Sequence, residues 1–418
     1  MMRKLALIPI VIALAAMLLI YPENCLSSAR YGLELWLTAV LPSLLPFMAA
    51  SFLLLETGVV RLLSAFLAPL TRLLFYAPGE SAYVFVASAV SGYPVGARLT
   101  AELYAHGELS GPDAQRIVRF TSVTGPVFIT GAVSAGMLGL PGAGAVLAGA
   151  HYLSAILTGI IMGLVDRRRH PAPPAARPRF KDVWARFRAD AAATPPVGTM
   201  LSTSVEKSLW ALIKVGGYII LFSVMLELLS VTGVMDVLVW LYSPLTKLAG
   251  LDGNAAAALL AGGVEMTAGC ARVAALSGDI TAKLVMISGI VAFGGFSVHM
   301  QTRAVCAPSN LSLKGFMLAK TLQGTLASVT TALLLIAFPL SQTVSTLLPE
   351  TKKAAFGGVI FALAVAVILL LIKLWQRSKP SFSCWKAPCG SYEEALNSRP
   401  SSSQAQPVYR RRIPSRRS

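Results

Sequence analysis

The sequence predicts an all-α polytopic membrane protein with two inverted-topology repeats and broken or re-entrant helices. Of its 418 residues, 55% are hydrophobic and 13% are charged, which excludes an ordinary soluble globular protein. Several apolar runs approach the roughly 20 residues that a membrane helix needs. Such continuous runs exclude a membrane β-barrel, whose strands alternate at every second residue. The runs are residues 5–20, 35–55, 143–165, 209–229, 322–340 and 354–374.

The net charge of +17 is concentrated outside these runs. Residues 166–190 hold eight basic and three acidic side chains, and residues 376–418 hold nine and two. Together with Arg3 and Lys4, these segments indicate the cytoplasmic side, because basic residues flank membrane spans on that side. We therefore expect both termini in the cytoplasm, contact with the lipid bilayer and no nucleic acid partner. A role of the basic segments in lipid or protein binding stays open.

Catalytic and metal-binding patterns are not found in the sequence. The cysteines at 25, 270, 306, 384 and 389 have no metal-ligand spacing and form no disulfide framework. Metalloprotease, P-loop and dinucleotide fingerprints do not occur, and the chain has four histidines in total. We expect no catalytic residue, no metal and no cofactor, so the chain is not expected to be an enzyme.

The chain divides into six predicted segments. Two of them are repeats, and the others are spans, a linker and a tail. They are an N-terminal membrane helix with an external loop (1–34), a first repeat (35–165), a basic cytoplasmic linker (166–206), a second repeat (207–345), a last membrane helix (346–375) and a disordered basic cytoplasmic tail (376–418).

Individual elements follow from local signals. Pro42 and Pro46 lie near the middle of one apolar run, which favours a kinked helix or a hairpin dipping into the bilayer. Segments 59–75 and 235–249 either cross the bilayer or lie flat on it. A polar loop at 107–114 precedes the next helix, and Ser110 or Asp113 is the expected N-cap.

Matching segments in the two halves indicate an internal repeat. Leu53-Leu-Leu-Glu-Thr-Gly-Val59 matches Leu228-Leu-Ser-Val-Thr-Gly-Val234, and Ala68-Pro-Leu-Thr-Arg-Leu73 matches Ser243-Pro-Leu-Thr-Lys-Leu248, both at a separation of 175 residues. Arg98 matches Arg272 at a separation of 174. The first half starts outside after one crossing, whereas the second starts from the cytoplasmic linker. Opposite entry predicts inverted repeats, a plan that many secondary transporters share and that places the solute at mid-bilayer.

Four motifs resemble those of a known family. Leu41-Pro-Ser-Leu-Leu-Pro-Phe47, Gly92-Tyr-Pro-Val-Gly-Ala97, Thr124-Gly-Pro126 and Glu265-Met-Thr267 are similar to motifs of the YlbJ-type sporulation integral membrane proteins. Those proteins carry nucleoside-recognition Gate domains and are related there to concentrative nucleoside transporters. The resemblance covers roughly residues 1–375 and implies two Gate-like repeats.

The resemblance also implies a function and a place. A YlbJ-type protein is expected in the outer forespore membrane, where it moves dipicolinic acid during sporulation and so supports the spore cortex and heat resistance. A nucleoside or another small metabolite is the second candidate solute. A membrane scaffold for spore assembly is a third possibility from a different class. The coupling ion and the oligomeric state are not predicted.

A dipicolinate site needs two cationic or N–H-rich poles and a flat apolar slot. Arg98 and Arg272 are the predicted poles, since guanidinium groups match carboxylates. Tyr93 is expected to stack on the ring, and Gly92 and Gly96 allow close approach of the backbone. The alternative is that both arginines lie at helix ends with their charged groups in water. Gly92/Gly96 and Gly159/Gly163 also suit helix packing.

The remaining candidates are polar residues inside apolar runs. Glu265 binds a coupling proton or sodium, or pairs with a cation such as Arg272 two turns further along. His299 is either a proton relay or a packed side chain. Ser and Thr hydroxyls in membrane helices often bond their own backbone, so their place on the path stays open. The further candidates for solute binding are Ser91, Thr121, Ser122, Thr124, Thr267, Ser297 and Gln301.

Overall fold

A computed structural model describes residues 2–93, 95–167, 194–248 and 250–338, with isolated positions between 183 and 189. The predicted last membrane helix, the tail and most of the basic linker lie outside the described residues. All regular structure in the described ranges is helical, in agreement with the predicted fold class.

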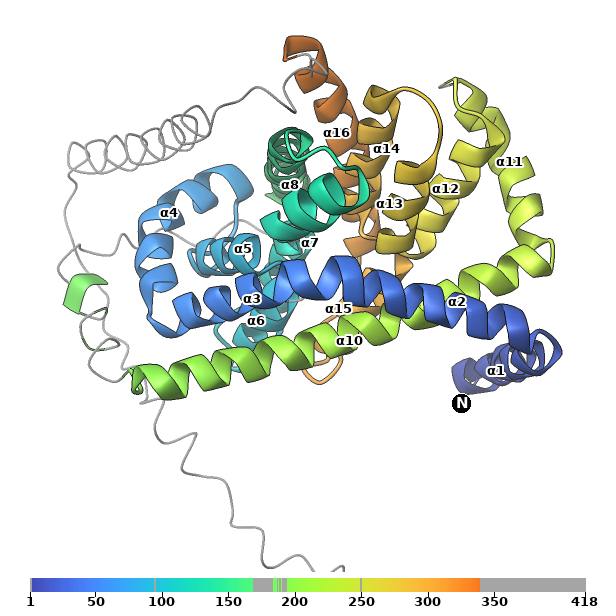
Figure 1. Ribbon diagram of the computed structural model, residues 1–418. Coiled ribbons are helices and arrows are strands. Elements are labelled where there is room, and N and C mark those ends of the chain that lie inside the picture. The colour runs from blue at the N-terminus through green and yellow to red at the C-terminus, as the bar shows by residue number, and fades with distance from the viewer. Residues whose placement is uncertain are drawn as a thin grey trace, which may run out of the picture. The chain divides into compact units, whose positions relative to one another are not determined.

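The helices of the first half follow one another with short connections (Figure 1). They are α1 (Met2–Ile20), α2 (Pro22–Leu35), the π-helix η1 (Trp36–Val40), α3 (Leu41–Glu56), α4 (Val59–Phe75), α5 (Glu80–Ser91), α6 (Val95–Ala105), α7 (Gly111–Thr121), the π-helix η2 (Phe128–Met137) and α8 (Ala143–Arg167).

The second half repeats this order. Its helices are α10 (Val197–Val231), α11 (Val234–Leu248), α12 (Gly253–Val264), α13 (Met266–Ala275), α14 (Ile280–Phe293), α15 (Gly295–Cys306) and α16 (Phe316–Ala337). In each half, a long helix and a shorter one precede two broken helices and a final long helix. The repeat predicted from sequence therefore corresponds to a repeated order of elements.

Within the described residues, five helical segments are long and apolar enough to cross a membrane. A sixth crossing is possible if α4 and α5, which meet at an angle of 103°, together form one span. The five segments are Pro22–Glu56, Ala143–Asp166, Val197–Val231, Ile280–Cys306 and Phe316–Ala337. The protein is thus a multi-pass integral membrane protein.

The first long span differs from the prediction. Residues 21–34 were expected to form an external loop and 35–57 a kinked helix or hairpin, but Pro22–Glu56 is a single 35-residue helical run. Pro22 and Glu23 suit a helix start, because proline lacks an N–H that would be unbonded there and the helix dipole favours an acid. The π-helix η1 ends at Val40, so Pro42 lies in the first turn of α3, where its missing N–H costs little.

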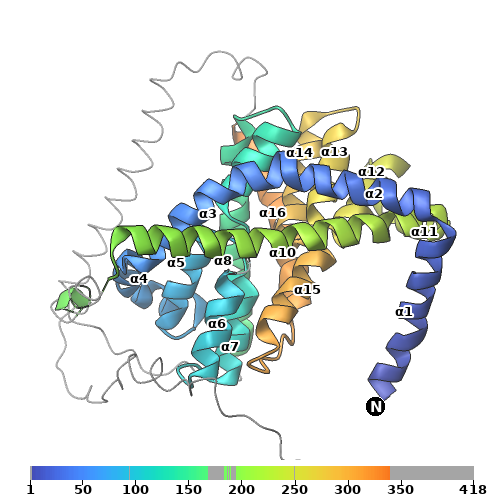
Figure 2. The same ribbon diagram turned by 60° about the horizontal axis from the view of Figure 1, so that its bottom comes forward.

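The helix α10 packs along this first span in the opposite direction (Figures 1 and 2). Asn24, near the start of the span, donates to Glu227 near the end of α10 at 3.2 Å. Lys207, near the start of α10, forms an ion pair with Glu56 at the end of the span. The two helices that open the two halves are therefore antiparallel.

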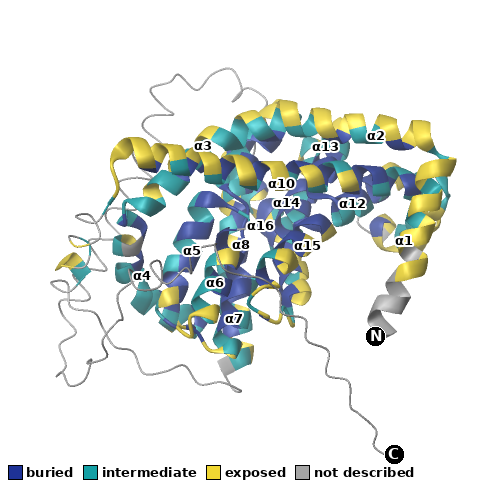
Figure 3. Ribbon diagram, turned by 90° about the horizontal axis from the view of Figure 1, so that it is seen from below, coloured by how far each residue is buried: buried dark blue, intermediate teal, exposed yellow. Residues whose placement is uncertain are grey.

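The interior of the described region contains α14 and α15, with α8 and α16 beside them. In the segment Ile280–Cys306, 56% of the most apolar 18-residue stretch is buried inside the protein, against 17% of the corresponding stretch in Pro22–Glu56. Figure 3 shows the difference: α14 and α15 are largely buried, whereas α2, α3 and α10 carry exposed faces. Thr331 of α16 donates to Ser288 of α14 at 2.7 Å, so polar side chains also join the inner helices.

Each half contains two breaks that touch one another, and glycine is required at both contacts. Gly92 follows α5 with φ +74°, and a Cβ there would lie 2.7 Å from the backbone nitrogen of Gly125 in the break after α7. In the second half Gly295 has φ +68°, and a Cβ there would lie 2.9 Å from the carbonyl oxygen of Gly262, just before the break after α12. The breaks predicted from sequence are therefore paired within each half.

The other predicted glycine notches pack helices together. A Cβ on Gly159 would lie 2.8 Å from the ring of Phe75, and one on Gly163 would lie 2.6 Å from the Phe75 carbonyl oxygen. A Cβ on Gly96 would lie 2.7 Å from the carbonyl oxygen of Thr121, so Gly96 allows α6 to approach α7. At the start of α7, Ser110 is the N-cap, as predicted, and accepts from the Asp113 nitrogen.

Candidate functional site

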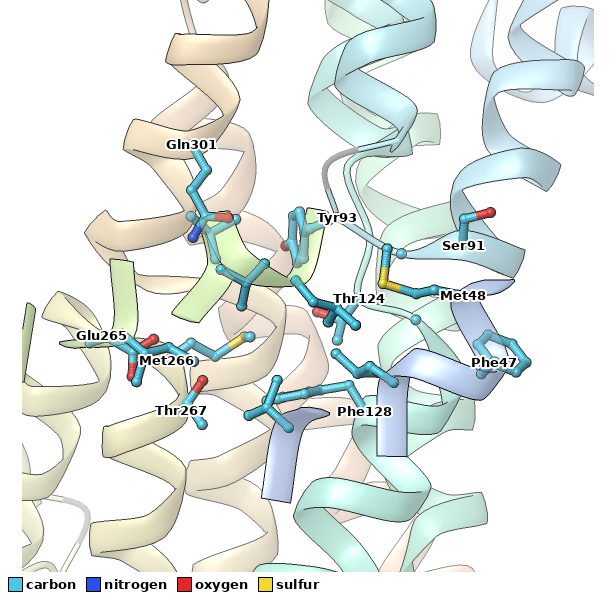
Figure 4. A pocket seen from close by; sticks show the side chains of 18 residues that line it. Phe47, Met48, Ser91, Tyr93, Thr124, Phe128, Glu265, Met266, Thr267 and Gln301 are labelled. Carbon is cyan, nitrogen blue, oxygen red and sulfur yellow. The ribbon is translucent and has the colours of Figure 1, made fainter. Parts of the chain in front are cut away.

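A cavity lies where the breaks of the two halves meet (Figure 4). It has about 640 Å³ of space not filled by protein atoms, part of it open to the surroundings. Four regions line it: the first span, the breaks of the first half, α10, and the break after α12 with the neighbouring α15. The lining residues are Val40, Leu44, Phe47, Met48, Ser91, Gly92, Tyr93, Thr124, Gly125, Phe128, Leu212, Val215, Ile219, Glu265, Met266, Thr267, Val298 and Gln301.

The carboxylate of the cavity belongs to Glu265, which joins two half-helices. Glu265 ends α12 and is the N-cap of α13, where its side chain accepts from the Ala268 nitrogen at 2.6 Å. Ser297 of α15 donates to its other oxygen at 3.4 Å. Among the described residues no cation forms an ion pair with this buried carboxylate, including Arg272. The positive end of α13 and the two donors are its polar partners instead.

The break after α7 is held from outside by α8. The Thr124 nitrogen donates to Nε2 of His151 at 3.0 Å. Tyr152 donates to the Thr124 carbonyl at 3.0 Å and to the Ala89 carbonyl of α5 at 3.1 Å. These contacts satisfy backbone groups that the break removes from the helix, which a bilayer interior requires.

A buried lysine lies behind the aromatic wall of the cavity. Lys320 of α16 donates from Nζ to the carbonyl oxygen of Ser122 at 2.9 Å and to the side chain of Gln323 at 2.7 Å. The same Nζ lies 5.2 Å from the centre of the Tyr93 ring, a distance that suits a cation–π contact. Tyr93 therefore contacts both the cavity and the lysine.

Half of the predicted candidates line this cavity. They come from both halves of the chain and include a carboxylate, an amide and four hydroxyls, one of them phenolic. Ser91 has a buried hydroxyl without a hydrogen-bond partner among the described residues, so this hydroxyl is available to a solute. The candidates that line the cavity are Ser91, Gly92, Tyr93, Thr124, Glu265, Thr267 and Gln301.

The structure does not place the two predicted cationic poles in the cavity. Arg98 is exposed on α6 and forms an ion pair with Glu102 at 2.7 Å, one helical turn further along. Arg272 lies in the last turn of α13 and is partly exposed. Charged groups of arginines at helix ends reach water, and a cation is favoured at the C-terminal end of a helix.

Four other candidates also lie outside the lining. Thr121 donates to the carbonyl of Ile117 in its own helix. Ser122 offers its backbone carbonyl to Lys320, and its buried hydroxyl has no hydrogen-bond partner among the described residues. Ser297 contacts the cavity only through Glu265. His299 lies against the Phe293 carbonyl at 3.0 Å and packs between aromatic rings, which agrees with a packed side chain.

Sequence reasoning missed Lys320, His151 and the apolar wall. The predicted span began at residue 322, so Lys320 was not recognised as an intramembrane cation, although a lysine inside an apolar helix is a functional signal. His151 had no motif around it. The wall from α3 and α10, which includes Phe47 and Leu212, follows only from the packing of two distant helices.

Comparisons with known proteins identify relatives of this chain. The Gate family, described as nucleoside recognition, matches residues 212–351, within and just beyond the second repeat. The sporulation integral membrane protein YlbJ of Bacillus subtilis (strain 168) is 35% identical over 328 residues, covering 77% of this chain and 80% of that protein. The chain belongs to the YlbJ family. Neither match is to an enzyme, in agreement with the prediction.

Solved structures of CNTnw have a more distant similarity to this YlbJ-family chain. An inward-facing, substrate-bound state is 16% identical with a TM-score of 0.46, covering 76% of this chain and 85% of that one. An outward-facing state of a double variant is 17% identical with a TM-score of 0.45, covering 81% and 86%.

Proposed function

We propose that this chain transports a small anionic solute across a membrane, and that the planar dianion dipicolinate is the solute. The observation that carries the proposal is the cavity at the meeting point of the breaks of both halves, in a multi-pass protein of the YlbJ family. Broken helices at a central cavity provide the hydrogen-bonding groups that a polar solute loses when it leaves water. The proposed location is the outer forespore membrane, with both termini in the cytoplasm.

Inverted repeats would provide alternating access to such a cavity. The antiparallel packing of Pro22–Glu56 and α10 supports inversion, because these helices open the two repeats. Both halves also contribute breaks to the same cavity, those after α5 and α7 from the first half and the one after α12 from the second. In our proposal the two halves move relative to one another and expose the cavity to either side in turn.

The lining of the cavity suits a flat ring. Phe47, Tyr93 and Phe128 provide aromatic surface, and Thr124 and Thr267 provide hydroxyls nearby (Figure 4). Aromatic rings stack favourably on planar solutes. A carboxylate of dipicolinate would also be attracted by Lys320 through the Tyr93 ring.

A nucleoside is the second candidate, and a specific observation favours it. The charged side chain that lines the cavity is Glu265, which accepts hydrogen bonds and repels carboxylates, and Gln301 adds an amide. Hydroxyl groups of a ribose would donate to Glu265. The Gate family's description as nucleoside recognition points the same way.

The experiment is uptake by purified full-length protein in lipid vesicles. Radiolabelled dipicolinate and radiolabelled uridine are supplied outside, and accumulation is compared with protein-free vesicles. We expect saturable dipicolinate uptake that excess unlabelled dipicolinate suppresses. If the protein takes up uridine but not dipicolinate, the solute is a nucleoside and dipicolinate is ruled out. Binding and uptake of neither solute by correctly inserted protein would favour the scaffold and contradict transport.

A further inference from the structure

Lys320 is a fully buried lysine inside a candidate membrane span. Its Nζ touches the backbone of the break after α7 and the ring of Tyr93, so it lies at the junction of α16 with the first-half breaks. A lysine inside a membrane span is costly, and such residues lie in a protein interior for a reason.

The charged form of Lys320 is only partly compensated. Among the described residues, no carboxylate lies within ion-pair distance of its Nζ. The Ser122 carbonyl belongs to the C-terminal end of α7, where the helix dipole favours a cation, and the Tyr93 ring adds a cation–π contact. The Ser122 carbonyl, the Gln323 side chain and the Tyr93 ring carry no full negative charge, so they do not replace a carboxylate in a medium of low dielectric constant.

Both protonation states suit the observed contacts. A neutral amine has two N–H groups, and the structure provides two acceptors, the Ser122 carbonyl and the Gln323 side chain. An ammonium has one further N–H and needs a nearby anion. The empty cavity therefore favours the amine, and an anionic solute in the cavity favours the ammonium.

Other titratable groups face Lys320 from the neighbouring elements. They are His151 of α8, His299 of α15 and Tyr93 at the break after α5. His151 accepts from the Thr124 nitrogen, so a proton on that Nε2 would break the contact that anchors the break. His299 is held by the Phe293 carbonyl among aromatic rings. Of these groups, Lys320 is the one that contacts both the break after α7 and the cavity-lining Tyr93 ring.

We propose that Lys320 is a proton-coupling site, at which one proton is taken up when an anionic solute enters the cavity and released when it leaves. The inference rests on the proposed function. On entry, the nitrogen lone pair of the amine forms an N–H bond to a proton from the aqueous side of entry. On exit, this bond breaks and the proton passes to water on the other side, so one proton moves with each solute.

The test uses full-length protein in vesicles that contain a trapped pH-sensitive dye. Radiolabelled dipicolinate is the probe, and a pH gradient is imposed with the outside acidic. We expect the gradient to raise wild-type uptake and the dye to report internal acidification that depends on dipicolinate. In Lys320→Met, gradient-driven uptake should fall at least about tenfold, since the protonated group is lost. The matched control is Lys314→Met, an exposed lysine near the start of the same helix.

Solute exchange separates coupling from a structural role. Vesicles preloaded with unlabelled dipicolinate exchange it for labelled dipicolinate without net proton movement. If Lys320→Met still exchanges solute but no longer takes it up in response to the pH gradient, Lys320 acts in proton coupling and is not merely structural. If that variant does not fold, Lys320→Arg keeps a permanent charge and should exchange solute but not respond to the gradient.

Two results would overturn the inference. One is wild-type uptake that is insensitive to the gradient and moves no protons; the other is proton movement in Lys320→Met equal to that of the wild type. Transport would stand in both cases. A wild type that takes up neither dipicolinate nor uridine would instead contradict the proposed function.

Discussion

Glu265 caps a half-helix inside the protein and also lines the cavity. Its contact to the Ala268 nitrogen replaces a backbone bond that the break removes, and its second oxygen meets Ser297. An N-cap contributes about 0.5–2 kcal/mol to stability. The same carboxylate decides which solutes the cavity accepts, because it repels an anion and accepts from a hydroxyl.

Glu265→Gln should separate the two candidate solutes. Glutamine keeps an oxygen that can accept from the Ala268 nitrogen, so the folded protein should persist. Uridine uptake should fall, since a hydrogen bond to a charged acceptor contributes about 1.5–3 kcal/mol. Dipicolinate uptake should be unchanged or higher. Vesicle uptake of both solutes measures this, and Glu80→Gln, an exposed glutamate at the start of α5, is the control. An equal fall in the uptake of both solutes would contradict the role given to the Glu265 carboxylate in selecting between them.

At the residue scale, the sequence predicted polar cavity residues better than charged ones. Tyr93, Glu265 and Gln301 stood out because they interrupt apolar runs, and all line the cavity. Arg98 stood out for the same reason, but its guanidinium lies at the surface, where it pairs with Glu102 one helical turn further along. Whether a cation in an apolar run points inward depends on where its helix ends, which composition does not specify.

Breaks in the inner helices are the structural elements that form the site. The first-half pair meets at Gly92 and Gly125, and the second-half pair meets at Gly295 and Gly262. Each contact brings two backbones too close for a side chain. These glycine contacts fix the positions of the breaks, whose backbone N–H and C=O groups lack helical hydrogen-bond partners.

Gly92→Ala should destabilise the first pair of breaks. Its φ of +74° and ψ of −165° belong to a region used almost only by glycine, and the added Cβ would meet the Gly125 nitrogen at 2.7 Å. Gly107→Ala is the matched control, since Gly107 has φ +76° but no atom within 4 Å of a Cβ. We expect a loss of about 1–3 kcal/mol beyond the control from the close contact. Thermal unfolding in detergent checks this; equal midpoints would show that the breaks do not touch.

At the element scale, glycine and proline signals predicted the breaks but not the length of the first span. Residues 22–35 contain too few apolar side chains to predict a membrane helix, and they were expected to form a loop. The structure makes them helical by continuity with η1 and α3 and by packing on α10. Packing against a distant helix is not visible in a local sequence window.

For the whole molecule, the repeat was predictable because similar segments recur at a constant separation. The direction of the second half was inferred from charge, and the antiparallel contact of Pro22–Glu56 with α10 supports it. Which helices line the cavity could not be predicted, because α3 and α10 belong to different halves and meet only in the folded chain.

Opposite entry of the halves predicts opposite faces for corresponding loops. The loops are 106–110, before α7, and 276–279, before α14. Glu108→Cys and Ser277→Cys are made singly in a chain whose native cysteines are alanine, and intact cells are treated with a membrane-impermeant maleimide. One position should react only after the membrane is opened, and the other without opening. Reaction of both from one side would contradict inverted repeats.

The most direct test of the central claim is dipicolinate uptake before and after chemical modification of the cavity. Thr267→Cys places a thiol in the lining, and Thr302→Cys places one at a buried position of α15 outside it. A small methanethiosulfonate reagent should abolish uptake by Thr267→Cys, and dipicolinate present during treatment should slow that loss. Thr302→Cys should be unaffected. Full uptake by Thr267→Cys after mass spectrometry has shown complete modification would contradict a solute path through this cavity.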